Sequence, residues 1–266
     1  MKRVLFAALV ITALLLSLAG TVAAAPPADN PGKGPPELDK IVFIHYAKDF
    51  APGKPEGTPG KSPGGKNEEN GEDPIDYYKL LRLELTGTAE YYVNPNVHLV
   101  TEGEPIDAII AGFEAWDAVT AAFDNTGGLF EYAAAPPPGV TVEYGIVGNK
   151  QNTISWGDLQ EGIVAMACIW YIPGKPPRDI VEFDVVFNTF YDWGIDPDGE
   201  GPLVIDAFDI QNIATHEAGH PVGLADLYDD IYWMLTMYGY GSEGETIKCS
   251  LESGDILGAQ KLYGTP

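Results

Sequence analysis

Residues 216–226 read His-Glu-Ala-Gly-His-Pro-Val-Gly-Leu-Ala-Asp. On an α-helix, residues four positions apart lie on one face, so His216 and His220 can present both imidazoles to a single metal ion. Glu217 follows the first histidine, where its carboxylate can reach a water molecule beside that metal. The segment therefore predicts a helix that carries two zinc ligands and a general base.

A catalytic zinc site needs a third protein ligand and one open position. Gly223 can adopt the left-handed backbone conformation that ends a helix, and the chain can then return toward the metal at Asp226. Pro221 lies between these features and removes one helical N–H, while its ring crowds the carbonyl of Glu217. We therefore expect some distortion of the last helical turn.

The segment resembles the extended metzincin motif, His-Glu-x-x-His-x-x-Gly-x-x-His, with Asp226 in place of the final histidine. Some bacterial metzincins use Asp at that position. Residues 236–238, Thr-Met-Tyr, fall where metzincins carry a methionine turn below the metal. The resemblance implies a zinc ion with Glu217 as catalytic base, Met237 beneath it, and three ligands: His216, His220 and Asp226.

Four further stretches resemble parts of the matrixin catalytic domain. Residues 112–120 resemble its first helix, 154–158 the segment after its second strand, 183–188 its edge strand over the substrate cleft, and 254–264 its closing helix. The resemblance spans about residues 88–264 and implies a zincin-like fold with a twisted mixed sheet, a long first helix, an active-site helix and a C-terminal helix. The order of predicted strands and helices independently indicates an α+β fold.

The resemblance also implies a secreted endopeptidase whose peptide substrate binds in an extended form along the edge strand near residues 180–188. One alternative is a catalytically silent zinc protein that binds peptides or a surface partner through the same cleft. A second is a thermolysin-type peptidase, in which the third ligand would be one of three later acidic residues: Glu243, Glu245 or Glu252.

The N-terminal region has the organisation of a secreted precursor. A cationic start precedes the apolar residues 4–18 and the Ala-Ala-Ala run at 23–25, which predicts a signal peptide over residues 1–25. A retained membrane anchor is the alternative. Residues 26–75 are predicted to be a leader rich in Pro and Gly, with a low-complexity segment and one short strand at 40–46. The catalytic domain is expected over residues 76–266.

The composition is strongly acidic. The formal net charge is −24, and removal of Lys2 and Arg3 with the signal peptide makes it −26. Nucleic acids and anionic membranes would repel such a surface, which argues against both as partners once the signal is removed. Acidic proteins can bind calcium, and the cluster at 196–200 supplies the candidate ligands Asp196, Asp198 and Glu200; a solvated acidic loop is the alternative.

The two cysteines, Cys168 and Cys249, are expected to form a disulfide in a secreted protein, with two buried free thiols as the alternative. Vertebrate matrixins are kept latent by a propeptide cysteine that acts as fourth zinc ligand, but no cysteine precedes Cys168. The chain is therefore either made active or inhibited by residues 26–75 in another way. His45 and His98 lie outside any ligand spacing and are interpreted as ordinary strand or loop histidines.

Overall fold

The computed structural model describes residues 37–50, 73–94, 96, 99, 101–123, 128–135, 148–196 and 206–266. The predicted signal peptide and much of the predicted leader lie outside these ranges. The helices are α1 Pro105–Asp117, α2 Ile210–Val222 and α3 Ser253–Tyr263, with single 3₁₀ turns η1 Lys48–Phe50, η2 Pro74–Asp76, η3 Asp230–Tyr232 and η4 Ile247–Cys249. The strands are β1 Asp39–Ala47, β2 Leu83–Glu84, β3 Ala89–Val93, β4 Phe130–Tyr132, β5 Asn152–Gly157, β6 Ile163–Tyr171, β7 Arg178–Asn188, β8 Trp193–Gly194, β9 Phe208–Asp209 and β10 Tyr240–Gly241.

Eight of these strands form one mixed sheet in the order β10-β1-β6-β7-β5-β3-β4, with β2 paired to the start of β7. β6 runs antiparallel to both of its neighbours, whereas β7, β5, β3 and β4 pair in parallel. The predicted α+β class is confirmed. Within the described residues, no helix has the length and apolar character needed to span a membrane.

The prediction that residues 180–188 form an edge strand is wrong. β7 lies inside the sheet, between β6 and β5. Residues 182–188 are all buried, so side chains on both faces of this part of β7 are covered. A strand covered on both sides is a central strand, and its continuous apolar run shows no alternation of polar and apolar residues.

The strand predicted at 40–46 is confirmed, but it belongs to the sheet. β1 pairs antiparallel with β6 from Asp39 to Tyr46, so the folded domain includes a segment N-terminal to the expected boundary at residue 76. Alternate β1 residues are buried, and these face the helices: Ile41, Phe43, His45 and Ala47. The expected start of the domain is therefore corrected to include β1.

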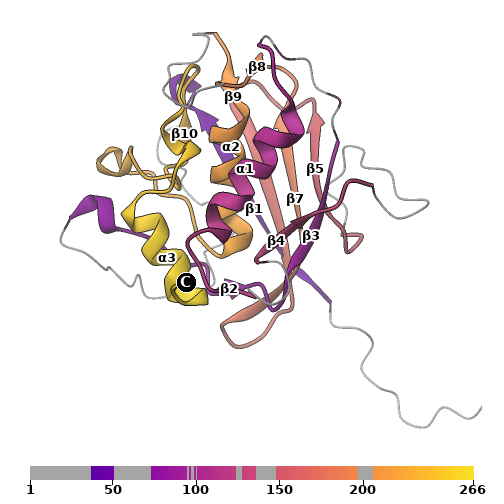
Figure 1. The fold of residues 1–266 in the computed structure, drawn as a ribbon, viewed down its shortest axis with the longest axis vertical. Helices are drawn as coiled ribbons and strands as arrows, with labels where there is room; N and C mark the ends of the chain where they lie inside the picture. Colours follow the sequence, from indigo (N-terminus) through magenta and orange to yellow (C-terminus); the bar gives the residue numbers. More distant parts are fainter. Residues whose placement is uncertain are drawn as a thin grey trace, which may run out of the picture. The chain divides into compact units, whose positions relative to one another are not determined.

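Helices α1 and α2 cover one face of the sheet, and Figure 1 shows α1 in front of α2 in this view. The two helices approach closely at Gly112, where an added Cβ atom would lie 2.8 Å from the Thr215 nitrogen. The Trp116 indole N–H also donates to the Thr215 carbonyl over 2.9 Å. α1 ends at Asp117, whereas apolar residues at three- and four-residue spacing predict a helix over residues 106–123. Phe123 has a positive φ of 52° that an α-helix does not allow.

Nearly every residue of α2 is buried, as expected for a helix at the centre of a domain. Its N-cap is Asp209, whose carboxylate accepts a hydrogen bond from the Asn212 N–H. The sequence predicts Asp206 as the N-cap, and this prediction is wrong by three positions. Gly223 ends the helix with φ of 111°, as predicted. The helix continues through Pro221 to Val222, so the expected distortion does not interrupt it. A proline this close to the C-terminus removes a single intrahelical hydrogen bond.

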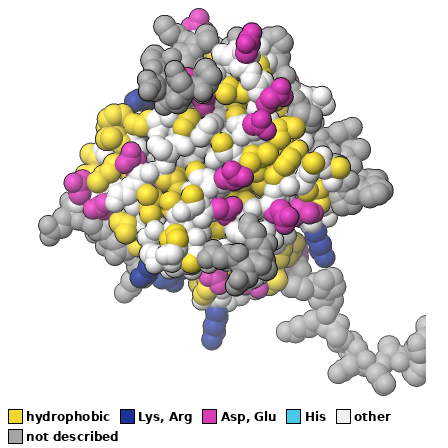
Figure 2. Space-filling view, viewed as in Figure 1, with side chains coloured by type: hydrophobic (Ala, Val, Ile, Leu, Met, Phe, Trp, Pro, Cys, Tyr) yellow, Lys and Arg dark blue, Asp and Glu magenta, His cyan; other side chains and the backbone are white. Residues whose placement is uncertain are grey.

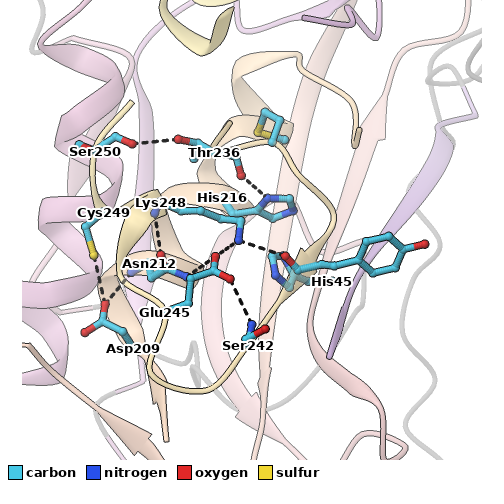
Figure 3. Close-up of polar contacts among 12 residues, drawn as sticks. His45, Asp209, Asn212, His216, Thr236, Ser242, Glu245, Lys248, Cys249 and Ser250 are labelled. Atoms are coloured by element: carbon cyan, nitrogen blue, oxygen red, sulfur yellow. Dashed lines mark hydrogen bonds and ion pairs between the residues drawn. The ribbon is translucent and has the colours of Figure 1, made fainter. Parts of the chain in front are cut away.

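The predicted disulfide is not formed, and both cysteines are free thiols. Ala167 and Ile169 belong to the core under the helices, so the side chain of Cys168 between them points to the opposite face of the sheet. Cys249 lies in η4, which packs against α2, and its thiol donates to the Asp209 carboxylate over 3.3 Å (Figure 3). The sheet separates the two sulfur atoms, which sequence spacing does not reveal.

Candidate metal centre

The two motif histidines are buried and fixed by their outer ring nitrogens. His216 Nδ1 donates to the Thr236 carbonyl over 2.7 Å, and His220 Nδ1 donates to the Leu224 carbonyl over 3.0 Å (Figure 3 shows the first). A carbonyl can only accept, so each Nδ1 carries the hydrogen and each Nε2 presents a lone pair. Hydrogen bonds of this kind, from the ring nitrogen that faces away from the metal, orient histidine ligands in metal sites.

Asp226 completes the group. Its Oδ1 lies 3.2 Å from His216 Nε2 and 3.5 Å from His220 Nε2, and its Oδ2 accepts a hydrogen bond from the Tyr228 hydroxyl over 2.9 Å. Ligand atoms bonded to one tetrahedral zinc ion at 2.0–2.2 Å would be separated by about 3.4 Å. Asp226 Oδ1 therefore lies at the distance from both imidazoles that one zinc ion requires, and the three donor atoms all lie within 4.8 Å of one another.

The polarity of these atoms supports the same conclusion. His216 Nε2, Asp226 Oδ1 and both oxygens of Glu217 are buried without a hydrogen-bond partner. A lone pair on His216 Nε2 facing a carboxylate oxygen at 3.2 Å is repulsive unless a cation lies between them. The residues present thus fit a zinc ion, with the Glu217 carboxylate beside it.

Burial shifts the ionisable groups of this site. It raises the pKa of Glu217 well above its usual value, and the neighbouring Asp226 charge adds to that shift. Burial lowers the pKa of His220 to about 4, which keeps the imidazole neutral as a ligand must be. Burial alone would raise the pKa of Asp226, but His220 and His216 together lower it overall. The Asp226 carboxylate thus faces the neutral His220 imidazole, and the Glu217 carboxyl, which has a high proton affinity, lies beside them.

The methionine turn lies under α2, as the sequence predicted. An added Cβ atom on Gly219 would collide with Met237 Sδ, so the Met237 side chain packs directly against the helix that carries both histidines. The carbonyl of the preceding Thr236 holds His216. Met237 therefore supports the ligands without offering one.

Two residues of this site escaped the sequence analysis. Asp255 of α3 accepts hydrogen bonds from the Thr236 and Met237 N–H groups over 2.8 and 3.2 Å, and so fixes the methionine turn. Tyr228 orients Asp226. Asp255 lies in the stretch that resembles the closing helix, and Tyr228 lies two positions after the ligand, but neither position carries a spacing signal.

The alternative third ligands lie elsewhere. Glu245 forms an ion pair with the buried Lys248 ammonium, as Figure 3 shows, and Glu252 is the N-cap of α3. Glu243 lines a separate surface pocket near Asp206. Within the described ranges, the two residue groups that could hold a metal ion are His216-His220-Asp226 and His45-His216-Glu217. The arrangement favours Asp226 over the thermolysin-type alternative.

The second of these groups corrects the interpretation of His45 as an ordinary strand histidine. The His45 ring, on β1, packs edge-on against the His216 ring with centroids 4.1 Å apart. Its Nδ1 lies 3.8 Å from Glu217 Oε1. Burial lowers the pKa of His45 well below its usual value, with His216 and Lys248 adding to the shift. His98 lies outside the described residues.

The candidate calcium cluster remains a prediction. Asp198 and Glu200 lie outside the described residues, and of Asp196 the structure shows a backbone N–H that donates to Asp209 Oδ2 over 2.9 Å.

Comparison with known proteins identifies a family. No curated protein matches the chain significantly. The sequence profile of the Matrixin peptidase family matches residues 87–264, a segment that holds both motif histidines, Glu217, Asp226, the methionine turn and Asp255. β1 precedes the matched segment. With this match over two thirds of its length and the metal-binding geometry described above, the chain belongs to the Matrixin family of metzincin zinc peptidases.

Proposed function

We propose that this protein is a secreted zinc-dependent endopeptidase in which His216, His220 and Asp226 hold the metal and Glu217 is the general base. One observation carries the proposal. Three buried donor atoms converge with the spacing of zinc ligands, and each ligand side chain is oriented by a second hydrogen bond. An unpaired carboxylate lies beside them.

Zinc bound at this site supplies a Lewis acid that polarises the scissile carbonyl and makes water a nucleophile near neutral pH. Glu217 takes the proton from the attacking water and passes it to the leaving amine. Both oxygens of its carboxylate are buried without a hydrogen-bond partner, so they are available to accept that proton. The Thr236 and Leu224 carbonyls keep both imidazoles in place throughout.

The substrate is proposed to be an unfolded or loop segment of a protein, bound in an extended form by main-chain pairing with a strand beside the metal. That strand is β6, whose partner on the side away from β7 is β1, so a peptide can pair with β6 once β1 leaves this edge. Figure 2 shows acidic side chains spread over one face of the domain. With a net charge of −24, this surface disfavours nucleic acids and anionic membranes as partners.

The proposal of secretion rests on the sequence of residues 1–25, which has the order of a signal peptide. The family is compatible with this location. A fusion of residues 1–36 to a reporter enzyme, expressed in a bacterial host, tests it. Export with cleavage near residue 25 is the expected result, and a reporter retained with an uncleaved N-terminus contradicts it.

Zinc binding by purified chain variants tests the ligand set. The wild-type chain is expected to hold one zinc ion, and Asp226→Ala is expected to lose it during dialysis against a chelator that leaves the wild type loaded. Glu243→Gln and Glu252→Gln are the matched controls, since each removes one alternative carboxylate. Retention of zinc by Asp226→Ala, with loss in either control, would instead support a thermolysin-type site.

A further inference from the structure

β1 lies directly against the metal centre. The Phe43 ring stacks on the His220 ring with centroids 3.9 Å apart and planes 11° apart, and the His45 ring packs edge-on against His216. Both side chains project from the face of β1 that points toward α2. No other strand of the described sheet places an imidazole ring against these ligands.

The backbone of β1 pairs with neighbouring strands, as the backbone of a bound peptide does when it adds to a sheet. It runs antiparallel to β6 along most of its length and parallel to β10 at Tyr46 and Ala47. An extended peptide binds in the same way when it adds a strand to an exposed sheet edge through main-chain hydrogen bonds. The pairing with β6 is irregular between His45 and Tyr46, and such bulges re-aim side chains next to functional sites.

His45 is an unexplained buried polar group. Its side chain is 1% exposed, and neither ring nitrogen has a hydrogen-bond partner. A buried imidazole in this state is costly unless something binds it. Gly241 of β10 makes room for the ring, since a Cβ atom there would lie 2.7 Å from His45 Nε2. His216 belongs to both residue groups of the described chain that could hold a metal, His216-His220-Asp226 and His45-His216-Glu217, so His45 lies next to one of the three ligands.

We propose that β1 occupies the place of a substrate strand and that His45 is a fourth protein ligand of the metal, so that this form of the chain is latent. Zinc sites with four protein ligands are closed, whereas catalytic sites keep one position open for water or substrate. His45 also lies next to Glu217, where the attacking water would have to be. This inference rests on the proposed function, because it assigns the fourth position of that same zinc site.

The coordination of zinc in the full-length chain tests the proposal. X-ray absorption spectroscopy of the zinc-loaded wild type is expected to show three imidazole ligands. His45→Phe keeps a ring of similar size without a ligating nitrogen and is expected to show two. Ile44→Ala is the matched control, because this neighbouring side chain points to the opposite face of the sheet and pairs with Met166. It is expected to show three.

Casein cleavage by the same three proteins provides the second measurement. His45→Phe is expected to cleave at least about tenfold faster than the wild type and Ile44→Ala, because a larger fraction of molecules has an open metal position. Two imidazoles in the wild type would overturn the ligand assignment even if no variant folds. Equal cleavage by wild type and His45→Phe would overturn the latency. Absence of zinc from a folded wild-type chain would contradict the proposed function instead.

Discussion

At the scale of single residues, the metal centre depends on atoms that bind no metal themselves. Tyr228 donates to the outer oxygen of Asp226, and the Thr236 and Leu224 carbonyls fix the two imidazoles. These contacts leave one lone pair on each of the three side chains directed to a common point. The metal affinity of the site therefore depends on side chains and carbonyls around the ligands as much as on the ligands.

Tyr228→Phe tests this dependence, because it removes only the hydroxyl that orients Asp226. Loss of a hydrogen bond that orients a metal ligand is expected to weaken zinc binding about tenfold or more. Competition with a chromophoric chelator measures the affinity. Tyr132→Phe, far along the chain in β4, is the control and is expected to bind zinc as the wild type does. Unchanged affinity in Tyr228→Phe would show that Asp226 needs no such support.

The sequence predicted the parts of the site that are local in the chain. Helical spacing is enough to place His216, Glu217 and His220 together, and a glycine at the helix end is enough to bring Asp226 back. His45 and Asp255 come from β1 and α3, and only the folded chain brings them to the site. No spacing rule connects residues that are so far apart in sequence.

At the scale of elements, the position of α2 depends on a close contact with α1. An alanine at Gly112 would place its Cβ 2.8 Å from the Thr215 nitrogen and 3.0 Å from the Ala214 carbonyl carbon. These are backbone atoms of the helix that carries the ligands, and they cannot rotate away. The glycine thus sets the distance between the two helices.

Gly112→Ala is therefore expected to destabilise the fold by about 1–3 kcal/mol, the usual cost of overpacking. Urea denaturation of both proteins gives the difference in the free energy of unfolding. Gly174→Ala is the control, since an added Cβ there would have no neighbour within 4 Å. A stability for Gly112→Ala equal to that of the control would contradict the close contact.

Asp255 links α3 to the methionine turn and gives a prediction of pH dependence. Burial raises its pKa from 3.8 to about 6, against the lowering effect of the backbone donors Thr236, Glu252 and Met237. A raised pKa means that the folded state holds the proton more tightly than the unfolded state between those values. Stability contributed by this group is thus present below pH 3.8 and is lost as the pH rises through about 6.

Comparison with Asp255→Asn isolates this group. Between pH 4 and 7, the wild type is expected to lose about 2 kcal/mol of stability relative to the variant, which cannot ionise. Chemical denaturation of the metal-free proteins at both pH values measures the difference. A constant difference across this range would show that Asp255 is ionised with an ordinary pKa.

Sequence patterns predict which segments form strands, but not the order of those strands in the sheet. Apolar runs and turn residues predict the α+β class and strands at 89–93, 153–156 and 164–172, close to the observed β3, β5 and β6, because these signals are local. The identity of the edge strand did not follow. β7 was placed at the edge by resemblance, whereas its burial on both faces puts it inside the sheet, and β1 covers the edge of β6. Which strands pair is decided by contacts across the whole chain.

At the scale of the whole molecule, the net charge of −24 is a source of self-repulsion in the folded state. Salt screens such repulsion, with a Debye length of about 10 Å at 0.1 M. The melting temperature of the metal-free chain is therefore expected to rise by roughly a few degrees between about 0.02 and 0.3 M NaCl. Calorimetry at both concentrations measures it, and a lower melting temperature at high salt would contradict the expectation.

The central claim is that zinc and Glu217 together hydrolyse peptide bonds at this site. The most direct test is casein cleavage by the His45→Ala chain, with and without a zinc chelator, beside His45→Ala/Glu217→Gln. We predict chelator-sensitive cleavage that falls by about 10²–10⁴-fold in the double variant while zinc stays bound. Cleavage that persists in the double variant would contradict the assigned base. A folded, zinc-loaded His45→Ala chain without any cleavage would contradict the peptidase and support a silent zinc protein.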